Sequence, residues 1–191
     1  MKIDFKKDDF KELEEIQVDG KGEQICRILK QHIENKDLVN YIDRFRTAQR
    51  RLDTAIIAIE ENDLNKLKNI IDPQLVLMRD PRGLTLLHVA VCKERHEIVE
   101  YLADKFPDCI NVTDEVNGRT AVHFAATQQN AIYDTLLEYG ADSDLPDNDG
   151  WTAARYRTCP DRFIRPLSRV TCASSPLFTY LSFDENVFDP G

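Results

Sequence analysis

The fold is decided by three stretches that share one pattern: DPRGLTLLHVAV (80–91), EVNGRTAVHFAA (115–126) and DNDGWTAARYRT (147–158). Gly83, Gly118 and Gly150 are separated by 35 and 32 residues, and a threonine follows each glycine by two positions. His88 and His123 are also 35 residues apart. Recurrence at a period in the low thirties is typical of stacked repeats.

Each residue type in this pattern has a structural reason. Glycine accepts the positive φ of a tight turn. The threonine hydroxyl can cap the following helix. The histidine at the fourth motif position can bridge to backbone between neighbouring repeats, and the alanine two residues after it lets two helices approach closely.

The first two stretches resemble the signature of the ankyrin-repeat family, in which Thr-Pro-Leu-His follows a glycine turn. The proline of that signature is replaced by Leu86 and Ala121, which are both good helix residues. The stretches HEIVEYLADKFP (96–107) and AIYDTLLEYGAD (131–142) resemble the second helix of such a repeat. The resemblance covers about residues 50–158 and implies an all-α fold.

The units on either side depart from the signature. LDTAIIAIEENDLNKLKNIID (52–72) lacks the motif but keeps apolar residues at helical spacing, with Asp63 as the cap of its second helix. It is interpreted as a degenerate N-terminal capping repeat. In the last unit Arg155 replaces the motif histidine, Pro160 is expected to end the first helix, and Pro166 falls in the expected second helix.

The flanking segments are less regular. Helical spacing predicts a helix at 22–33, and Asp37 is interpreted as the N-cap of a longer helix that continues in phase toward Leu52. The apolar tail SSPLFTYLSFDENVF either packs on the end of the stack or docks into another protein.

The sequence therefore predicts an all-α fold, a short ankyrin-repeat solenoid with an N-terminal helical cap and an irregular C-terminal tail. Its predicted segments are a helical extension (1–49), a degenerate capping repeat (50–79), two repeats (80–114 and 115–146), a truncated repeat (147–160) and a proline- and aromatic-rich tail (161–191).

The composition narrows the function classes. The 191 residues include 25 Lys and Arg against 34 Asp and Glu, a net charge of −9. This balance argues against nucleic acid and anionic membrane surfaces as partners and leaves a basic protein partner open. The five cysteines are odd in number and scattered, the first residues carry no signal sequence, and no apolar run could span a membrane. A cytoplasmic protein is expected, with the cytoskeleton, the cilium or the nucleus as alternatives.

Catalytic and metal-binding patterns are weak. His88, Cys92 and His96 have a spacing that could present metal ligands on one helix, but the repeat register separates them. Phosphate-binding, zincin and nucleophile-elbow motifs are absent. We expect no catalytic residue, no metal and no cofactor. Lys2-Ile3-Asp4-Phe5 resembles the short docking motif of protein phosphatase 1 partners, but four loosely specified residues recur often by chance, and a charged, frayed N-terminus is the favoured interpretation.

The family resemblance implies a protein-interaction module that acts as a scaffold, adaptor or inhibitor and binds through turn tips and the concave face of the first helices. At the turns it implicates Arg82, Leu84, Asn117, Arg119, Asn148, Asp149 and Trp151. At the helix ends it implicates Cys92, Lys93, Thr127 and Gln128. Trp151 is the strongest candidate, unless it packs against the tail. Alanine at Trp151 or Arg119 is expected to weaken binding without lowering thermal stability.

Two alternative functions remain open at this point. One is a structural subunit of a larger cytoskeletal or axonemal assembly. The other is an inhibitor of a basic partner, such as a transcription factor, or a regulator of a phosphatase.

Overall fold

The computed structural model describes residues 36–128 and 130–159. This part of the chain is a stack of helices with isolated β-bridges at the turns and no named strand, which confirms the all-α prediction. In chain order its elements are α3 (Lys36–Glu60), α4 (Leu64–Ile70), α5 (Pro73–Leu77), α6 (Leu86–Cys92), α7 (His96–Lys105), the 3-10 helix η2 (Pro107–Cys109), α8 (Ala121–Ala125), α9 (Ile132–Glu138) and α10 (Ala153–Thr158). The predicted helix at 22–33, the motif at 2–5 and the tail at 161–191 lie outside the described residues.

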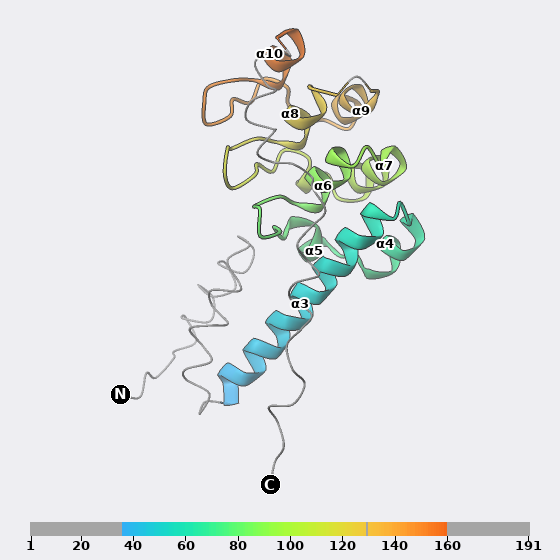
Figure 1. Ribbon diagram of the computed structural model, residues 1–191, viewed down its shortest axis with the longest axis vertical. Helices are drawn as coiled ribbons and strands as arrows, with labels where there is room; N and C mark the ends of the chain where they lie inside the picture. The colour runs from blue at the N-terminus through green and yellow to red at the C-terminus, as the bar shows by residue number, and fades with distance from the viewer. Residues whose placement is uncertain (1–35, 129, 160–191) are drawn as a thin grey trace, which may run out of the picture.

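The helices form two columns (Figure 1). The inner column contains α6, α8 and α10, each in contact with the next, and the outer column contains α4, α7 and α9. The loops that lead into α6, α8 and α10 project to one side of the stack, on the left in Figure 1. The outer helices lie on the opposite side, so the molecule has two different faces.

The first helix, α3, is continuous from Lys36 to Glu60, as the apolar phase toward Leu52 predicts. Its C-terminal half packs against α4, α5 and α6, and its N-terminal half extends beyond the stack (Figure 1). Asp37 lies inside the helix and not at its cap, and the predicted boundary between residues 49 and 50 also falls within it. Among the described residues, no helix combines the length and apolarity needed to cross a bilayer.

The helix caps and turns lie at the positions that the sequence predicts. The Asp63 carboxylate accepts a hydrogen bond from the backbone N–H of Lys66 at 2.9 Å and so caps α4. Threonines cap the inner helices α6, α8 and α10. The final helix ends at Thr158, two residues before Pro160, in agreement with the prediction for that proline.

Small side chains allow the helices to approach closely. Ala58 in α3, Ala90 in α6 and Ala125 in α8 occupy equivalent places in three successive repeats, and all three are fully buried. The remaining space is filled by branched aliphatic residues such as Leu87 and Leu136, which are also inaccessible to solvent. The core therefore runs continuously through the stack, because each repeat buries its apolar face only against its neighbours.

The turn glycines provide a first prediction. Gly83 and Gly150 have φ values of +80° and +75°, but only at Gly83 would an added Cβ meet a neighbour, the Glu115 Cβ at 2.7 Å. We expect Gly150→Ala to lower the free energy of unfolding by about 1 kcal/mol through φ strain, and Gly83→Ala by about 3 kcal/mol because the backbone must also move. Urea denaturation followed by circular dichroism measures both values, and equal losses would contradict the steric argument.

Candidate functional site

Each turn between repeats is built around one buried aspartate. The Asp80 Oδ1 atom accepts hydrogen bonds from the backbone N–H groups of Arg82 and Leu84, both at 2.9 Å. Asp114 and Asp147 accept the corresponding pairs of N–H groups at 2.7 to 3.1 Å. The carboxylate fixes the shape of the turn from within, and tip side chains add to it, since Arg82 pairs with Asp80 and the Asn148 side-chain amide donates to the Val116 carbonyl at 3.4 Å.

Backbone hydrogen bonds join the turns to one another. The Glu115 N–H donates to the Gly83 carbonyl at 3.2 Å, and the Asn148 N–H donates to the Asn117 carbonyl at 2.9 Å. The three turn tips therefore form one connected row along the side of the stack.

The motif histidines tie each inner helix to the following turn, as the sequence predicts. The His88 Nδ1 atom accepts from the Thr85 N–H at 3.3 Å, and its Nε2 atom lies 2.9 Å from the Arg119 carbonyl oxygen. Because a carbonyl only accepts, Nε2 must carry the proton. His123 makes the equivalent bond, with Nε2 at 3.2 Å from the Trp151 carbonyl oxygen.

Burial keeps both rings neutral. It lowers the pKa of His88 to about 4, although the hydrogen bond to the Arg119 carbonyl acts in the opposite direction. Burial lowers the pKa of His123 as well. Each imidazole also meets an aromatic ring edge-on, since His88 lies 5.4 Å from Phe124 and His123 lies 6.1 Å from Tyr156.

Arg119 is a buried structural residue, so the prediction that it is an exposed binding residue is wrong. Its side chain is fully buried, with Nε 3.1 Å from Asp147 Oδ2 and Nη2 3.3 Å from the Tyr156 hydroxyl. The Tyr156 hydroxyl also donates to Asp147 Oδ2 at 2.7 Å. Arg119 cannot be replaced by alanine without cost, because the carboxylate would lose its counter-charge.

The ionisation states of this cluster follow from its contacts. Burial alone would raise the pKa of Asp147, but hydrogen bonds from Tyr156, the Trp151 N–H and Arg119 hold it below its usual value. Burial raises the pKa of Tyr156 to about 12, and the hydrogen bond to Asp147 adds to the effect. The cluster therefore consists of a carboxylate, a guanidinium and a neutral phenol at pH 7.

Leu84 is also buried, at 2% exposure, which corrects its prediction as a binding residue. Leu84, Arg119 and Trp151 all follow directly after a turn glycine. This position precedes the helix cap and places its side chain under the turn, so it contributes to packing in each repeat.

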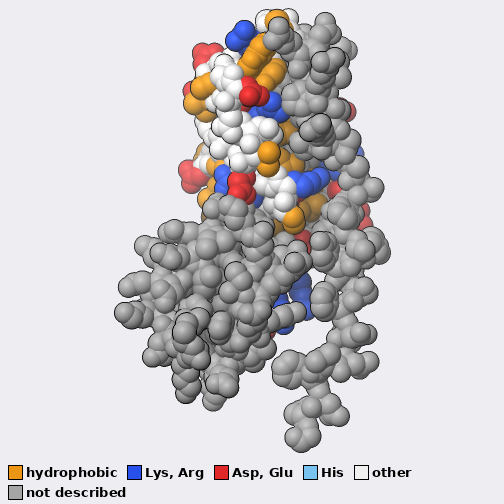
Figure 2. All heavy atoms as spheres, turned by 60° about the vertical axis from the view of Figure 1, so that its left-hand side comes forward, with side chains coloured by type: hydrophobic (Ala, Val, Ile, Leu, Met, Phe, Trp, Pro, Cys, Tyr) orange, Lys and Arg blue, Asp and Glu red, His pale blue; other side chains and the backbone are white. Residues whose placement is uncertain are grey.

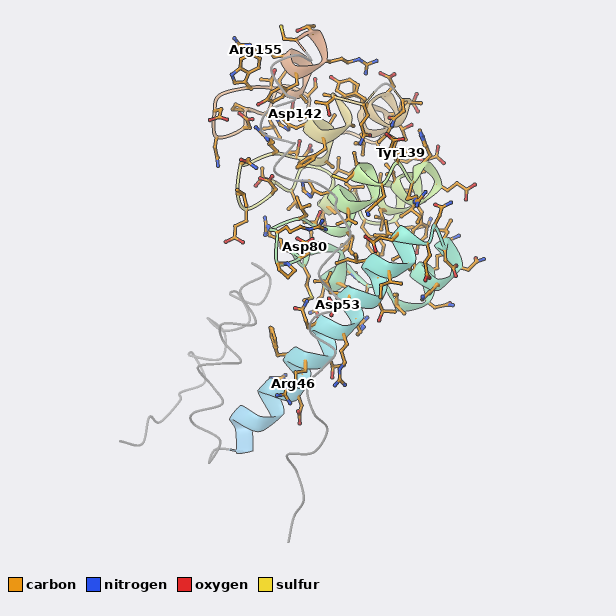
Figure 3. All side chains as sticks on the ribbon, viewed as in Figure 1. Arg46, Asp53, Asp80, Tyr139, Asp142 and Arg155 are labelled. Carbon is orange, nitrogen blue, oxygen red and sulfur yellow. The ribbon has the colours of Figure 1, made fainter. Side chains whose placement is uncertain are left out.

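Trp151 is half-buried against its own repeat. Its ring stacks on Tyr156 with centroids 5.3 Å apart, and the Arg155 guanidinium lies 3.8 Å from the Trp151 ring centroid. Figure 3 shows Arg155 on α10 at the end of the stack. The alternative that the tail covers Trp151 concerns residues outside the described part of the chain.

The implicated helix-end residues reach back to the preceding repeat. Lys93 Nζ pairs with Glu60 Oε1 at 2.9 Å, and Gln128 Nε2 donates to the Val91 carbonyl at 2.9 Å. Thr127 donates within its own helix turn, to a carbonyl at 2.9 Å. Lys93 and Gln128 therefore hold neighbouring repeats together, and all three half-buried side chains leave only part of their surface for a partner.

The turn tips themselves are accessible. Asn148 and Asp149 are exposed, Asn117 is half-buried, and Arg82 is held by an ion pair with Asp80 at 2.6 Å. Val116 was not among the predicted residues, yet at 65% it is an exposed aliphatic side chain at the middle tip. The sequence signal that could have identified Val116 is an aliphatic residue directly before an Asn-Gly turn. In the part of this face that Figure 2 colours, acidic, basic and hydrophobic side chains are interspersed.

The cysteines and histidines offer no reactive arrangement in the described ranges. No group of three or more His, Cys, Asp or Glu residues there could hold a metal ion. Both ring nitrogens of His88 are used within the stack, and His96 is exposed at the start of α7. Burial raises the pKa of the Cys109 thiol to about 12, which disfavours the reactive thiolate.

Comparison with known proteins identifies the repeats. Residues 55–147 match the family model described as ankyrin repeats in three copies. The matched segment runs from the C-terminal part of α3 to the third turn and includes both motif histidines. The predicted family resemblance is confirmed.

Similar curated proteins are diacylglycerol kinases. Rat diacylglycerol kinase iota is 33% identical over 128 residues, which are 63% of this chain and 12% of that protein. The human iota protein is 35% identical over 104 residues, or 52% of this chain and 10% of that protein, and rat diacylglycerol kinase zeta is 38% identical over 99 residues, or 51% and 11%. The chain spans about a tenth of the length of these relatives.

The buried ion pair leads to a second prediction. We expect Arg119→Met to lower the free energy of unfolding by about 3 kcal/mol, because Asp147 would remain buried without its guanidinium. Arg157→Met is the control, since Arg157 pairs with Asp134 at 2.9 Å on the surface, and its loss should be below about 1 kcal/mol. Thermal and urea unfolding measure both values, and similar losses would contradict a structural role for the buried pair.

The neutral histidines predict a pH dependence. His88 takes up a proton at about pH 6.5 when unfolded but only at about pH 4 when folded. The unfolded state therefore binds more protons in that window, and the free energy of unfolding should fall by about 3 kcal/mol as the pH drops through it. Urea titrations at several pH values measure this slope. His88→Gln should flatten it, and an unchanged slope in that variant would exclude His88 as the cause.

Proposed function

Because residues 55–147 of this chain are ankyrin repeats, we propose that the chain is a non-catalytic interaction module that binds a protein partner through its turn tips and the adjoining ends of the inner helices. The observation that carries this proposal is the row of turns, whose shape is fixed by buried aspartates while the tip side chains face solvent.

The rigidity of the row of turn tips favours the binding of a partner. Backbone bonds between neighbouring turns hold the tips before a partner arrives, so little ordering entropy is lost on association. Val116 is exposed at the middle tip, so its side chain is accessible to a partner while the buried Asp114 holds the turn.

The proposed contact surface has a centre and an edge. Val116 is its apolar centre, and the adjacent polar side chains are Arg82, Asn117, Asn148 and Asp149. The edge consists of the half-buried side chains Trp151, Lys93, Thr127 and Gln128. An accessible aliphatic residue within a polar rim matches the general anatomy of protein interfaces.

The biological role that we propose is that of a scaffold, adaptor or inhibitor in the cytoplasm. The scattered, odd-numbered cysteines support a reducing compartment. The similarity to diacylglycerol kinases involves only about a tenth of those proteins, so it supports a shared repeat segment and transfers no kinase activity to this chain.

Site-specific photocrosslinking tests the proposal. A photoreactive amino acid replaces Val116 at the middle tip, and in a matched protein it replaces Arg46, which α3 carries well away from the tips (Figure 3). We expect position 116 to capture in cells at least one protein that position 46 does not capture. Asn148→Ala together with Asp149→Ala in the same protein should reduce that capture several-fold. Identical captured proteins at both positions would contradict the proposed surface.

A further inference from the structure

The N-terminal half of α3 contains a buried ring that lies outside the core of the stack. Phe45 is 4% exposed, yet it does not belong to the continuous core of the described residues, which begins at Leu52. Figure 1 shows this half of α3 extending beyond the stack. Neighbours on the same helix leave the outward side of a phenyl ring open, so a ring buried to this degree needs another segment against it.

The ring continues the apolar stripe that α3 turns toward the stack. Phe45, Ala48 and Leu52 follow one another at spacings of three and four residues, which places them on one face of the helix. Leu52 is fully buried in the core, and Ala48 is half-buried against it. The exposed side chains of Arg44 and Arg46 border Phe45 on either side. The face that carries Phe45 is therefore an apolar strip with a charged rim.

This half of α3 needs a partner to remain helical. Residues 36–48 span about 20 Å at a rise of about 1.5 Å per residue, and isolated helices of this length are marginal in water. The exposed Arg46 and Arg50 are four residues apart, and such a like-charge pair lowers helix stability further. Packing against an apolar segment is the ordinary source of the missing stability.

The connectivity of the chain identifies an occupant for this face. Helical spacing predicts a helix at 22–33, a stretch outside the described residues, and its apolar side chains are Ile25, Ile28, Leu29 and Ile33. Only two residues separate this stretch from the start of α3. Connections of about two to five residues typically join two antiparallel helices.

The same connectivity sets the level at which the two stretches meet. Phe45 lies nine residues after Lys36, and Ile25 lies eight residues before Ile33. Because the rise per residue is the same in both helices, an antiparallel pair brings Phe45 and Ile25 to nearly the same level. The apolar tail at 161–191 instead follows α10, at the opposite end of the stack (Figure 1), so connectivity does not favour it as the occupant.

We propose that the Phe45 face of α3 is an intramolecular docking surface, on which residues 22–33 pack as an antiparallel helix with Ile25 and Ile28 against the Phe45 ring. The docked segment shields the apolar strip of α3 and supplies the cap that the first repeat of a stack needs. The surface lies away from the turn tips and uses none of their residues, so the proposal goes beyond the turn-tip function.

Photocrosslinking within the full chain tests the docking. A photoreactive phenylalanine analogue replaces Phe45, and in a matched protein it replaces Thr47, which is exposed and lies about 200° further round the helix. After irradiation of the dilute protein, tandem mass spectrometry should find the analogue at position 45 bonded to residues 22–33 of the same molecule, whereas the analogue at position 47 should not reach them. A bond to residues 161–191, a covalent dimer on a denaturing gel, no bond from position 45, or equal bonding from both positions would overturn the proposal.

Paired substitutions in the segment separate docking from mere proximity along the chain. Ile25→Ser with Ile28→Ser removes the apolar contact and should reduce the yield of the bond from position 45 several-fold. Glu23→Ser with Arg27→Ser is the control, since it introduces two serines on the opposite face of the predicted helix at unchanged net charge, and it should leave the yield unchanged. Equal losses in the two variants would overturn the proposal. The measurement needs no partner protein, so its failure is distinguishable from failure of the turn-tip surface.

Discussion

The structure depends on one buried hydrogen bond that is made twice, from a histidine Nε2–H in an inner helix to a backbone carbonyl in the following turn. A repeat of two short helices cannot bury its apolar faces alone, so its position must be defined by its neighbour. The imidazole ring fixes the position of its repeat relative to the following one. Nδ1 accepts from the backbone N–H of the capping threonine of its own helix while Nε2 donates to the next repeat, and the acceptance at Nδ1 requires a neutral ring. Protonation of these rings would therefore remove the bond to the helix cap and place a buried charge between repeats.

The turn has to offer its carbonyl at a fixed place for this bond to form. Asp114 and Asp147 achieve this by accepting backbone N–H groups inside the turn, where water cannot compete. Asp147 also accepts from Arg119 and Tyr156, so the last turn is held to the preceding one by charge as well as by backbone bonds. Since interior groups determine the turn, the tip residues are left to contact other molecules.

The sequence alone predicted the repeat fold, but it did not predict which side chains of the repeats are exposed. The spacing of glycine, threonine and histidine predicts the helices and the bridging role of His88, because these are local or one-repeat constraints. The burial of Arg119 depends on Asp147, 28 residues away, and on Tyr156, 37 residues away, so its position at the turn alone suggested a binding residue. Recurrence of the turn aspartates at 34 and 33 residues was the missed signal.

Position 155 determines how the stack ends. The earlier inner helices have an imidazole there that donates to the next turn, whereas α10 has Arg155, whose guanidinium lies over the Trp151 ring. A guanidinium on an aromatic face cannot replace the short, neutral donor that a following turn requires. The described stack thus has a direction: its register is transmitted from α6 to α10 and stops there. Among the described residues, the imidazole-to-turn bond thus joins α6 to the turn before α8 and α8 to the turn before α10, and α10 has an arginine at the equivalent position.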